Sequence, residues 1–227
     1  MKRLISVRGH HFWPDVLTSN AVVVDAGAHR GEFSRTLIER YGCRCVLVEA
    51  NPELASALEV PQALMIVTAA LTGSDGYGRF RLDANPESGA VVGRSEVHDS
   101  SGTLEVETLS LQSLMSRCAV SEIDLLKLDI EGSEADLIEL TPPEVWSRVG
   151  QISCEFHDFL PRFAGARFFE KARRRLEKLG FVCVVMSFRT YGDVLFINRQ
   201  RYGLSAVDCR CLQIASRYVE RLFPRHV

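Results

Sequence analysis

One stretch decides the fold of this chain: Val22-Val23-Val24-Asp25-Ala26-Gly27-Ala28-His29-Arg30-Gly31-Glu32-Phe33-Ser34. Its run of valines is typical of a buried strand. Beyond the two glycines, apolar residues recur at helical spacing as far as Tyr41, and Gly42 follows, where glycine ends many helices. Glycines let a backbone approach a ligand closely, and the N-terminus of a helix presents free N–H groups. The stretch therefore predicts a strand, a ligand-binding turn and a helix.

The composition is that of an ordinary globular protein. Its 227 residues are most simply one domain, with 46% hydrophobic and 25% charged residues. A net charge of −2 gives no electrostatic footprint for nucleic acid. The seven cysteines are scattered and odd in number, which suits a reducing compartment better than a disulfide framework. No apolar run resembles a signal peptide or is long enough to span a membrane, so we expect a cytoplasmic protein.

Further strands and helices alternate along the chain. Strands are predicted at Cys45–Glu49, Leu64–Ala69, Ile123–Asp129, Gly150–Phe156, Phe181–Met186 and Asp193–Ile197. Such alternation predicts an α/β fold whose mostly parallel sheet is covered by helices on both faces. Gly78–Leu82 and Thr103–Leu109 alternate apolar and polar residues and predict a small extra pair of strands, with a loop at Asn85–Gly102 over the ligand. The expected organisation is an N-terminal extension (1–20), the main domain (21–199) and a helical tail (200–227).

Acidic residues follow several of the predicted strands. Asp25, Glu49, Asp129 and Glu155 stand at four strand ends, and His157 follows two residues after Glu155. In parallel sheets, ligands bind beyond the carboxyl ends of the strands. We therefore expect these five side chains to converge on one site.

The turn after the first strand departs from the dinucleotide-binding fingerprint, which requires glycine where Asp25 stands. A carboxylate there would repel a pyrophosphate, and it suits a ligand with a cationic amino group or a sulfonium. Glu49 lies roughly twenty residues further on and can accept hydrogen bonds from two ribose hydroxyls. A nucleoside with an amino-acid tail and no phosphate fits both acids, which predicts S-adenosylmethionine as the cofactor. The alternative is that Asp25 caps a helix and Glu49 is a surface acid.

Three blocks of sequence carry a resemblance to a known family. They are Val24–Ser34, Val48-Glu49-Ala50-Asn51-Pro52 and Leu126-Lys127-Leu128-Asp129-Ile130-Glu131-Gly132-Ser133-Glu134, and Glu155-Phe156-His157 fits the same pattern. The chain resembles the FkbM-type methyltransferases from Val22 to Asn198, and the third block is the most specific. The resemblance implies a Rossmann-like, seven-stranded class I methyltransferase fold and O-methylation of a hydroxyl on a small molecule or sugar. His29 departs from the family pattern, in which asparagine is commoner.

Methyl transfer to a hydroxyl is assisted by a group that takes up the proton during attack. His157 is the predicted base, because a neutral imidazole is available at neutral pH. Glu155 shares its strand face and either orients His157 or faces the acceptor itself. A rival arrangement places a divalent cation on Asp129, Glu155 and His157. No spacing in the sequence demands a metal, so we expect no metal ligands.

The predicted function is S-adenosylmethionine-dependent O-methyl transfer. The predicted catalytic residues are His157, Glu155 and Asp129, and the predicted cofactor-binding residues are Asp25, Gly27, His29, Gly31, Phe33, Glu49, Ala50, Asn51, Ala70 and Asp129. We expect a small-molecule or glycan acceptor, no nucleic acid and no membrane, and allow for a homodimer. Two alternatives stay open. One is a domain that binds the cofactor or a partner without turnover; the other, opposed by Asp25, is a nicotinamide-dependent oxidoreductase.

Overall fold

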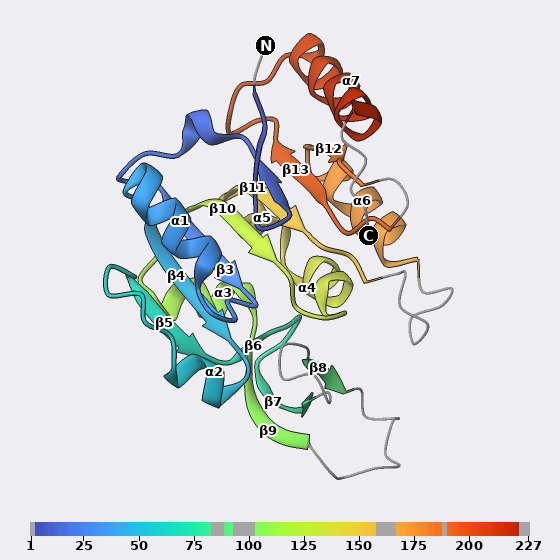
Figure 1. Cartoon of the computed structure of the whole chain (residues 1–227). Helices are drawn as coiled ribbons and strands as arrows, with labels where there is room; N and C mark the ends of the chain where they lie inside the picture. Colours follow the sequence, from blue (N-terminus) through green and yellow to red (C-terminus); the bar gives the residue numbers. More distant parts are fainter. Residues whose placement is uncertain (1–2, 83–88, 93–102, 158–166, 188–189, 223–227) are drawn as a thin grey trace.

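A seven-stranded sheet forms the centre of the protein (Figure 1). The computed structural model describes residues 3–82, 89–92, 103–157, 167–187 and 190–222. The strands of the sheet, in spatial order, are β12 (Phe181–Val185), β13 (Val194–Asn198), β11 (Val149–Cys154), β10 (Ile123–Leu128), β3 (Val22–Ala26), β4 (Arg44–Glu49) and β5 (Met65–Thr68). Strand β13 runs antiparallel to both of its neighbours, β11 and β12, and the other strand pairs of this sheet are parallel. The predicted α/β fold is confirmed, and each strand begins and ends within one or two residues of its prediction.

Helices cover both faces of the sheet. Along β3, Val22 and Val24 face one hydrophobic core and Val23 faces another, because successive side chains of a strand point to opposite faces. The first core is completed by α3 (Leu111–Arg117), α4 (Glu134–Leu140), α5 (Pro143–Trp146) and α6 (Phe168–Lys178). On the opposite face lie α1 (Glu32–Tyr41) and α7 (Ala206–Leu222). A strand with apolar residues on both faces is therefore buried on both, as the valine run predicted.

The N-terminal segment forms a β-hairpin that lies on the same face as α1 and α7. Its strands are β1 (Ile5–Val7) and β2 (His10–Phe12), and a short 3-10 helix, η1 (Pro14–Val16), follows. Arg8 and Gly9 form the two-residue turn, both with positive φ (49° and 88°). The Gln151 side chain accepts a hydrogen bond from the Trp13 amide (2.8 Å) and donates one to its carbonyl (3.0 Å), so the segment is tied to β11. The domain boundaries at 20 and 199 stay predictions.

A second, smaller sheet follows β5. The predicted pair of extra strands exists as β7 (Gly76–Leu82) and β9 (Thr103–Leu109), which run antiparallel. Two further strands join them, β6 (Ala70–Leu71) and β8 (Gly89–Val92), in the order β6-β9-β7-β8. The prediction of only a pair was wrong, since β6 is too short to show a period, and β8 lies within the predicted loop at 85–102. Apart from β8, that predicted loop lies outside the described residues.

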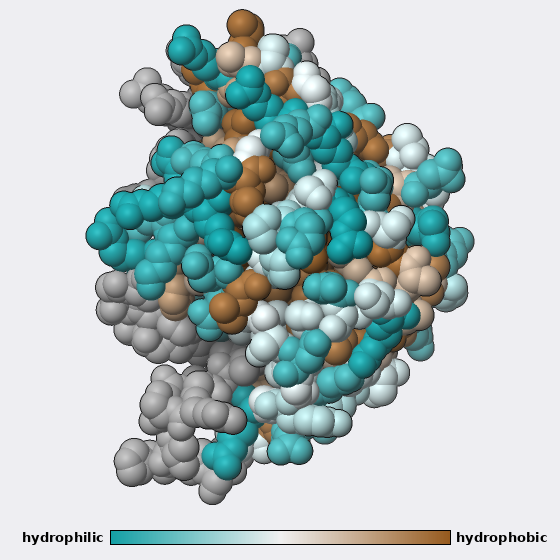
Figure 2. Space-filling model, turned by 180° about the vertical axis from the view of Figure 1, so that it is seen from behind, coloured by the Kyte–Doolittle hydropathy of each residue, from teal (hydrophilic) through white to brown (hydrophobic). Residues whose placement is uncertain are grey.

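Helix α7 lies within the predicted C-terminal tail, and its apolar residues Cys209 and Leu212 are buried beside β12 and β13. None of the described helices combines the length and the apolar character needed to cross a membrane. The face of the molecule in Figure 2 is mostly polar, with apolar residues in small separate patches.

Candidate active site

A cavity of about 300 Å³ opens beyond the carboxyl ends of β3, β4 and β10. Much of its lining is apolar and consists of Val48, Leu54, Ala69, Ala70, Leu71 and Phe80. Phe80 belongs to β7, so the small sheet supplies part of this wall. The polar lining includes the carboxylates of Glu49, Asp129 and Glu131, with basic groups such as Lys127 and Arg8. The strand ends therefore meet at a single cavity whose lining combines apolar residues with carboxylates.

The glycine turn brings backbone of β3 against backbone of β10. A Cβ atom on Gly27 would lie 1.8 Å from the carbonyl oxygen of Asp129, and its φ is +77°. Gly31 begins α1 with φ +71°, and a Cβ there would lie 2.7 Å from Val60 Cγ2. Gly27 is on the cavity wall and Gly31 is not. Of the two glycines, we therefore expect only Gly27 to approach a ligand, and Gly31 to serve the packing of α1.

Replacing Gly27 with alanine will lower stability well beyond the cost of its backbone conformation. Gly203 provides the control, because it has φ +58° and nothing within 4 Å of its Cβ position. We expect Gly203→Ala to cost about 1 kcal/mol for the left-handed conformation alone. Gly27→Ala will cost roughly 2 kcal/mol more, since the Asp129 backbone must move. Urea unfolding of both variants measures the difference, and equal losses of stability would show that the turn and β10 are not in close contact.

Glu49 is held by backbone amides from two segments. Its Oε2 accepts the N–H of His29 (2.8 Å) and its Oε1 accepts the N–H of Asn51 (2.9 Å). Glu49 is buried, yet it lines the cavity, and each oxygen keeps a second lone pair. Asn51 caps α2 (Pro52–Ser56) by accepting the N–H of Glu53 (2.9 Å). The arrangement gives a fixed carboxylate that can accept hydrogen bonds from two neighbouring hydroxyls, as the sequence interpretation required.

His29, Phe33 and Ala50 also line the cavity, and their binding of the cofactor stays a prediction. His29 has φ +50°, a conformation that histidine and asparagine adopt more readily than most residues. This explains on physical grounds why either residue fits the position. The Nε2 atom of His29 is buried and has no hydrogen-bond partner among the described residues.

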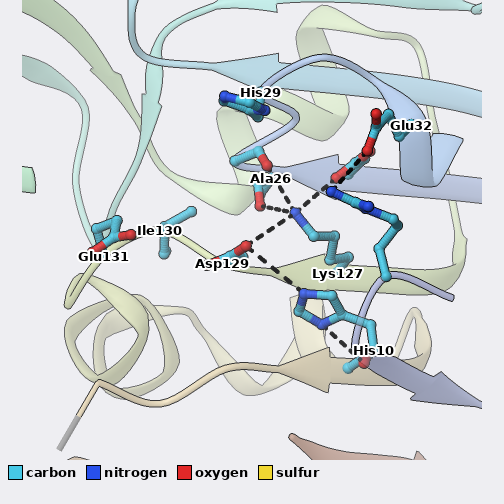
Figure 3. Close-up of polar contacts among 12 residues, drawn as sticks. His10, Ala26, His29, Glu32, Lys127, Asp129, Ile130 and Glu131 are labelled. Atoms are coloured by element: carbon cyan, nitrogen blue, oxygen red, sulfur yellow. Dashed lines mark hydrogen bonds and ion pairs between the residues drawn. The ribbon is translucent and has the colours of Figure 1, made fainter. Parts of the chain in front are cut away.

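Asp25 lies beneath the cavity rather than on its wall. It is fully buried, its Oδ2 accepts a hydrogen bond from Ser34 Oγ (2.8 Å), and its Oδ1 lies 3.1 Å from Lys127 Nζ. Lys127 stands beside Asp25 in the register of β10 and β3, and its Nζ also donates to the Gly27 carbonyl (2.7 Å; Figure 3). Burial by itself would lower the pKa of Lys127, but Asp25 and Asp129 outweigh it and raise the pKa. The sequence interpretation gave Asp25 a cationic ligand as its partner; in the structure, Lys127 takes that place.

Asp129 stands between three cationic or imidazole groups. Its Oδ2 lies 3.6 Å from Lys127 Nζ and 3.8 Å from His10 Nε2, and its Oδ1 lies 3.9 Å from His157 Nε2 (Figure 3 shows the first two contacts). Burial by itself would raise the pKa of Asp129, but Lys127, His10 and His157 outweigh it and hold the pKa well below its usual range. Asp129 is therefore an ionised carboxylate on the cavity wall.

His157 is surrounded by acids. Its Nδ1 lies 3.1 Å from Oε1 of the fully buried Glu134, and its Nε2 lies 3.7 Å from Glu131 Oε2. Burial would lower the pKa of His157, but the hydrogen bond and charge of Glu134, with Glu131 and Asp129, raise it to about 9. The sequence argument assumed an ordinary imidazole that is neutral at neutral pH. The structure corrects that assumption, because the surrounding acids keep the ring protonated.

Glu155 is half-buried, and burial together with the charge of Asp129 raises its pKa to about 7. Among the described residues, its carboxylate has no hydrogen-bond partner. The three predicted catalytic residues thus lie within one cluster, but only Asp129 of the three lines the cavity. Whether they act in catalysis stays a prediction.

Sequence reasoning missed His10. Its side chain is buried, it lines the cavity, and its ring packs edge-on against Phe33 with centroids 5.8 Å apart. The sequence held one signal for the hairpin that carries His10. Gly9 lies just after a short alternating segment, and glycine is common in hairpin turns. Glu131 and Glu134 also join the site, from the block that carries the family resemblance.

Two sets of three side chains place their ligand atoms within 4.8 Å of one another, a spacing that a metal ion could bridge. They are His10, Asp129 and Glu155, and Asp129, Glu131 and His157. The rival sequence interpretation placed a metal on Asp129, Glu155 and His157. The structure does not group these three, because Glu155 belongs to the first set and His157 to the second.

Comparison with known proteins shows which family the chain belongs to. The sequence profile of the methyltransferase FkbM domain matches residues 25–183, which include the glycine turn, Glu49, Asp129 and His157. No curated protein matches the chain. All of the similar solved structures given next are methyltransferases by title.

The precorrin-6y C5,15-methyltransferase of Geobacter metallireducens is 13% identical, with a TM-score of 0.43, and the match covers 80% of each chain. A TehB-like SAM-dependent methyltransferase of Corynebacterium glutamicum is 14% identical, with a TM-score of 0.40 over 78% of this chain and 80% of that one. A methyltransferase of Pyrococcus furiosus is 11% identical, with a TM-score of 0.39 over 81% of this chain and 77% of that one. These similarities are too remote to carry further argument. The family profile spans most of the chain, and the protein therefore belongs to the FkbM methyltransferase family, whose cofactor is S-adenosylmethionine.

Proposed function

We propose that the protein transfers the methyl group of S-adenosylmethionine to a hydroxyl oxygen of a small molecule or glycan. The observation that carries this proposal is that one cavity combines apolar lining residues and Glu49 with the carboxylates of Asp129 and Glu131. The apolar residues and Glu49 suit the adenosine of the cofactor. The carboxylates of Asp129 and Glu131 can accept hydrogen bonds from a polar acceptor.

Methyl transfer from a sulfonium is an in-line displacement, so much of the rate comes from positioning the two reactants. In the proposed complex, Glu49 fixes the ribose and Asp129 meets the acceptor, and both lie close to the glycine turn. The acceptor oxygen forms its bond to the methyl carbon as the carbon–sulfur bond breaks. The sulfonium becomes the neutral thioether of S-adenosylhomocysteine.

Asp129, Glu155 and His157 are the catalytic residues of this proposal. Asp129 lines the cavity and accepts a hydrogen bond from the acceptor hydroxyl. Glu155 takes up the proton, because its carboxylate has no hydrogen-bond partner among the described residues and its ligand atom lies within 4.8 Å of that of Asp129. His157 is held by Glu134 and keeps Asp129 and Glu131 in place.

The acceptor is proposed to be polar and glycan-like. The carboxylates of Asp129 and Glu131 and the exposed Arg8 guanidinium on the cavity lining favour a polar acceptor over an apolar one. The cytoplasm remains the proposed location, because none of the seven cysteines is in a disulfide. The allowance for a homodimer stays a prediction.

Removing the proposed proton acceptor will stop turnover without removing the cofactor site. We expect Glu155→Gln and Asp129→Asn to lower the turnover number by roughly 100-fold or more, within the range for general-base groups. Release of S-adenosylhomocysteine, measured with a panel of sugars and small hydroxyl compounds, gives the rate. Titration with S-adenosylhomocysteine should show affinity within a fewfold of the original protein for Glu155→Gln.

Two outcomes contradict the proposal. Full turnover by Glu155→Gln would remove Glu155 from the proton path. Tight binding of S-adenosylhomocysteine with no transfer to any hydroxyl in the panel would favour the domain that binds the cofactor without turnover.

A further inference from the structure

We propose that His10, Asp129 and Glu155 bind a divalent transition-metal cation at the acidic end of the cavity. The three side chains come from β2 and from the segments that follow β10 and β11. His10 lies outside the 25–183 segment that matches the family. Binding of the ion is independent of the proposed function, whereas its role in methyl transfer rests on that function.

The first support is the spacing of the donor atoms. His10 Nε2 lies 3.8 Å from Asp129 Oδ2, which is too long for a hydrogen bond. An ion about 2.1 Å from each donor holds two donors about 3.0 Å apart at right angles and about 4.2 Å apart when they are opposite. The 3.8 Å separation falls between these limits, and all three donors lie within 4.8 Å of one another. Small side-chain rotations bring all three to one ion.

The second support is the imidazole of His10, which is buried as a whole but lines the cavity. The His10 side chain is only 3% exposed, and its Nε2 is directed at Asp129 (Figure 3). Among the described residues, no acceptor or donor lies within hydrogen-bond distance of this nitrogen. A lone pair on this nitrogen is therefore available to an ion in the cavity.

The other nitrogen of His10 is held as in metal-binding histidines. Its Nδ1 lies 3.3 Å from Ser153 Oγ on β11. When Nδ1–H donates to this hydroxyl, the lone pair of Nε2 points toward Asp129. A hydrogen bond at the far nitrogen commonly fixes both the tautomer and the ring orientation of a ligating histidine.

The charges around the site leave room for a divalent cation. Lys127 is the cation closest to Asp129 Oδ2 in Figure 3, at 3.6 Å, and would repel an ion there. Lys127 is nearer to the fully buried Asp25, at 3.1 Å, which balances its charge. His157, which lies 3.9 Å from Asp129 Oδ1, is balanced by Glu131 and Glu134. A ligating carboxylate must be deprotonated, so Asp129 and Glu155 contribute two negative charges when the ion binds, and a divalent ion neutralises both.

The donor set also selects the kind of metal. One imidazole and two carboxylates suit manganese, iron or zinc, whereas magnesium prefers oxygen ligands and water. In the proposed reaction, the ion binds the acceptor oxygen and lowers the pKa of its hydroxyl. One Glu155 oxygen binds the ion and the other takes the proton. The oxygen–carbon bond then forms as the carbon–sulfur bond breaks.

Manganese binding provides a test that needs no activity. Protein treated with a chelator is titrated with Mn²⁺, and free Mn²⁺ is followed by electron paramagnetic resonance. We expect one ion per chain, and at least tenfold weaker binding by His10→Asn and by Glu155→Gln. Glu139→Gln is the control, because Glu139 is an exposed acid on α4 away from the cavity, and it should bind like the original protein.

Glu155→Gln keeps the test decisive if His10→Asn fails to fold, because Glu155 is only half-buried. Absence of stoichiometric binding in the original protein would overturn the proposal. So would loss of binding in His157→Asn with unchanged binding in His10→Asn, since the ion would then belong to the set with Glu131. Methyl transfer that persists with chelator removes the ion from the reaction and leaves the proposed function intact. Manganese binding without any methyl transfer supports the metal site and contradicts the proposed function.

Discussion

Replacing Lys127 with methionine will lower the free energy of unfolding by about 3–5 kcal/mol, the cost of leaving a buried charge without its partner. Asp25 is fully buried, and Lys127 Nζ lies 3.1 Å from its Oδ1. The same ammonium group donates to the Gly27 carbonyl at 2.7 Å, so its loss also frees the ligand-binding turn. For a domain of this size, the fall in Tm will be on the order of 10 °C. Thermal and urea unfolding measure both quantities.

The double variant Asp25→Asn with Lys127→Met tests the reason for this loss. An asparagine oxygen can still accept the Ser34 hydrogen bond, and no buried charge is left alone. We therefore expect the double variant to be more stable than Lys127→Met alone, because the two substitutions are coupled. If the losses simply add, the ion pair beneath the cavity does not hold the turn.

Replacing Glu49 with alanine will weaken the binding of S-adenosylhomocysteine by on the order of 100-fold, the expected loss of two hydrogen bonds to a charged acceptor. Glu49 is fixed by the amides of His29 and Asn51, so in the proposed complex it would meet the ribose hydroxyls without losing further freedom. Isothermal titration gives the affinity. Glu53→Gln is the control, since Glu53 is an exposed acid in α2 and does not line the cavity.

Thermal unfolding separates a local effect from a general one. Glu49→Ala must retain a cooperative transition for the affinity to be interpreted, because the two amides lose a buried acceptor. Unchanged affinity in a folded Glu49→Ala protein would contradict the assignment of this end of the cavity to the ribose.

The strands of the sheet were predictable because each carries a local pattern. Val22–Ala26 is apolar on both faces, and its observed bounds match the prediction. The small sheet was only half predicted, since β6 has two residues and can show no period. Strands that short are defined by their partners rather than by their own sequence.

The sequence predicted the acidic residues of the candidate site but not the basic residues that contact them. Glu49 and Asp129 line the cavity as the strand ends indicated. Lys127 faces Asp25 because the two stand side by side in the register of β10 and β3, and register is a property of the folded sheet. His10 reaches the cavity through a hairpin that packs on β11, more than a hundred residues away in sequence. Such contacts are non-local, so a local pattern does not contain them.

The identity of the atom that receives the methyl group tests the central claim most directly. S-adenosylmethionine with an isotope-labelled methyl group is incubated with the protein and the acceptor panel, and the product is analysed by nuclear magnetic resonance. We predict a labelled methyl group on a hydroxyl oxygen with the original protein, and none with Glu155→Gln. A labelled methyl group on nitrogen or carbon would contradict the proposal.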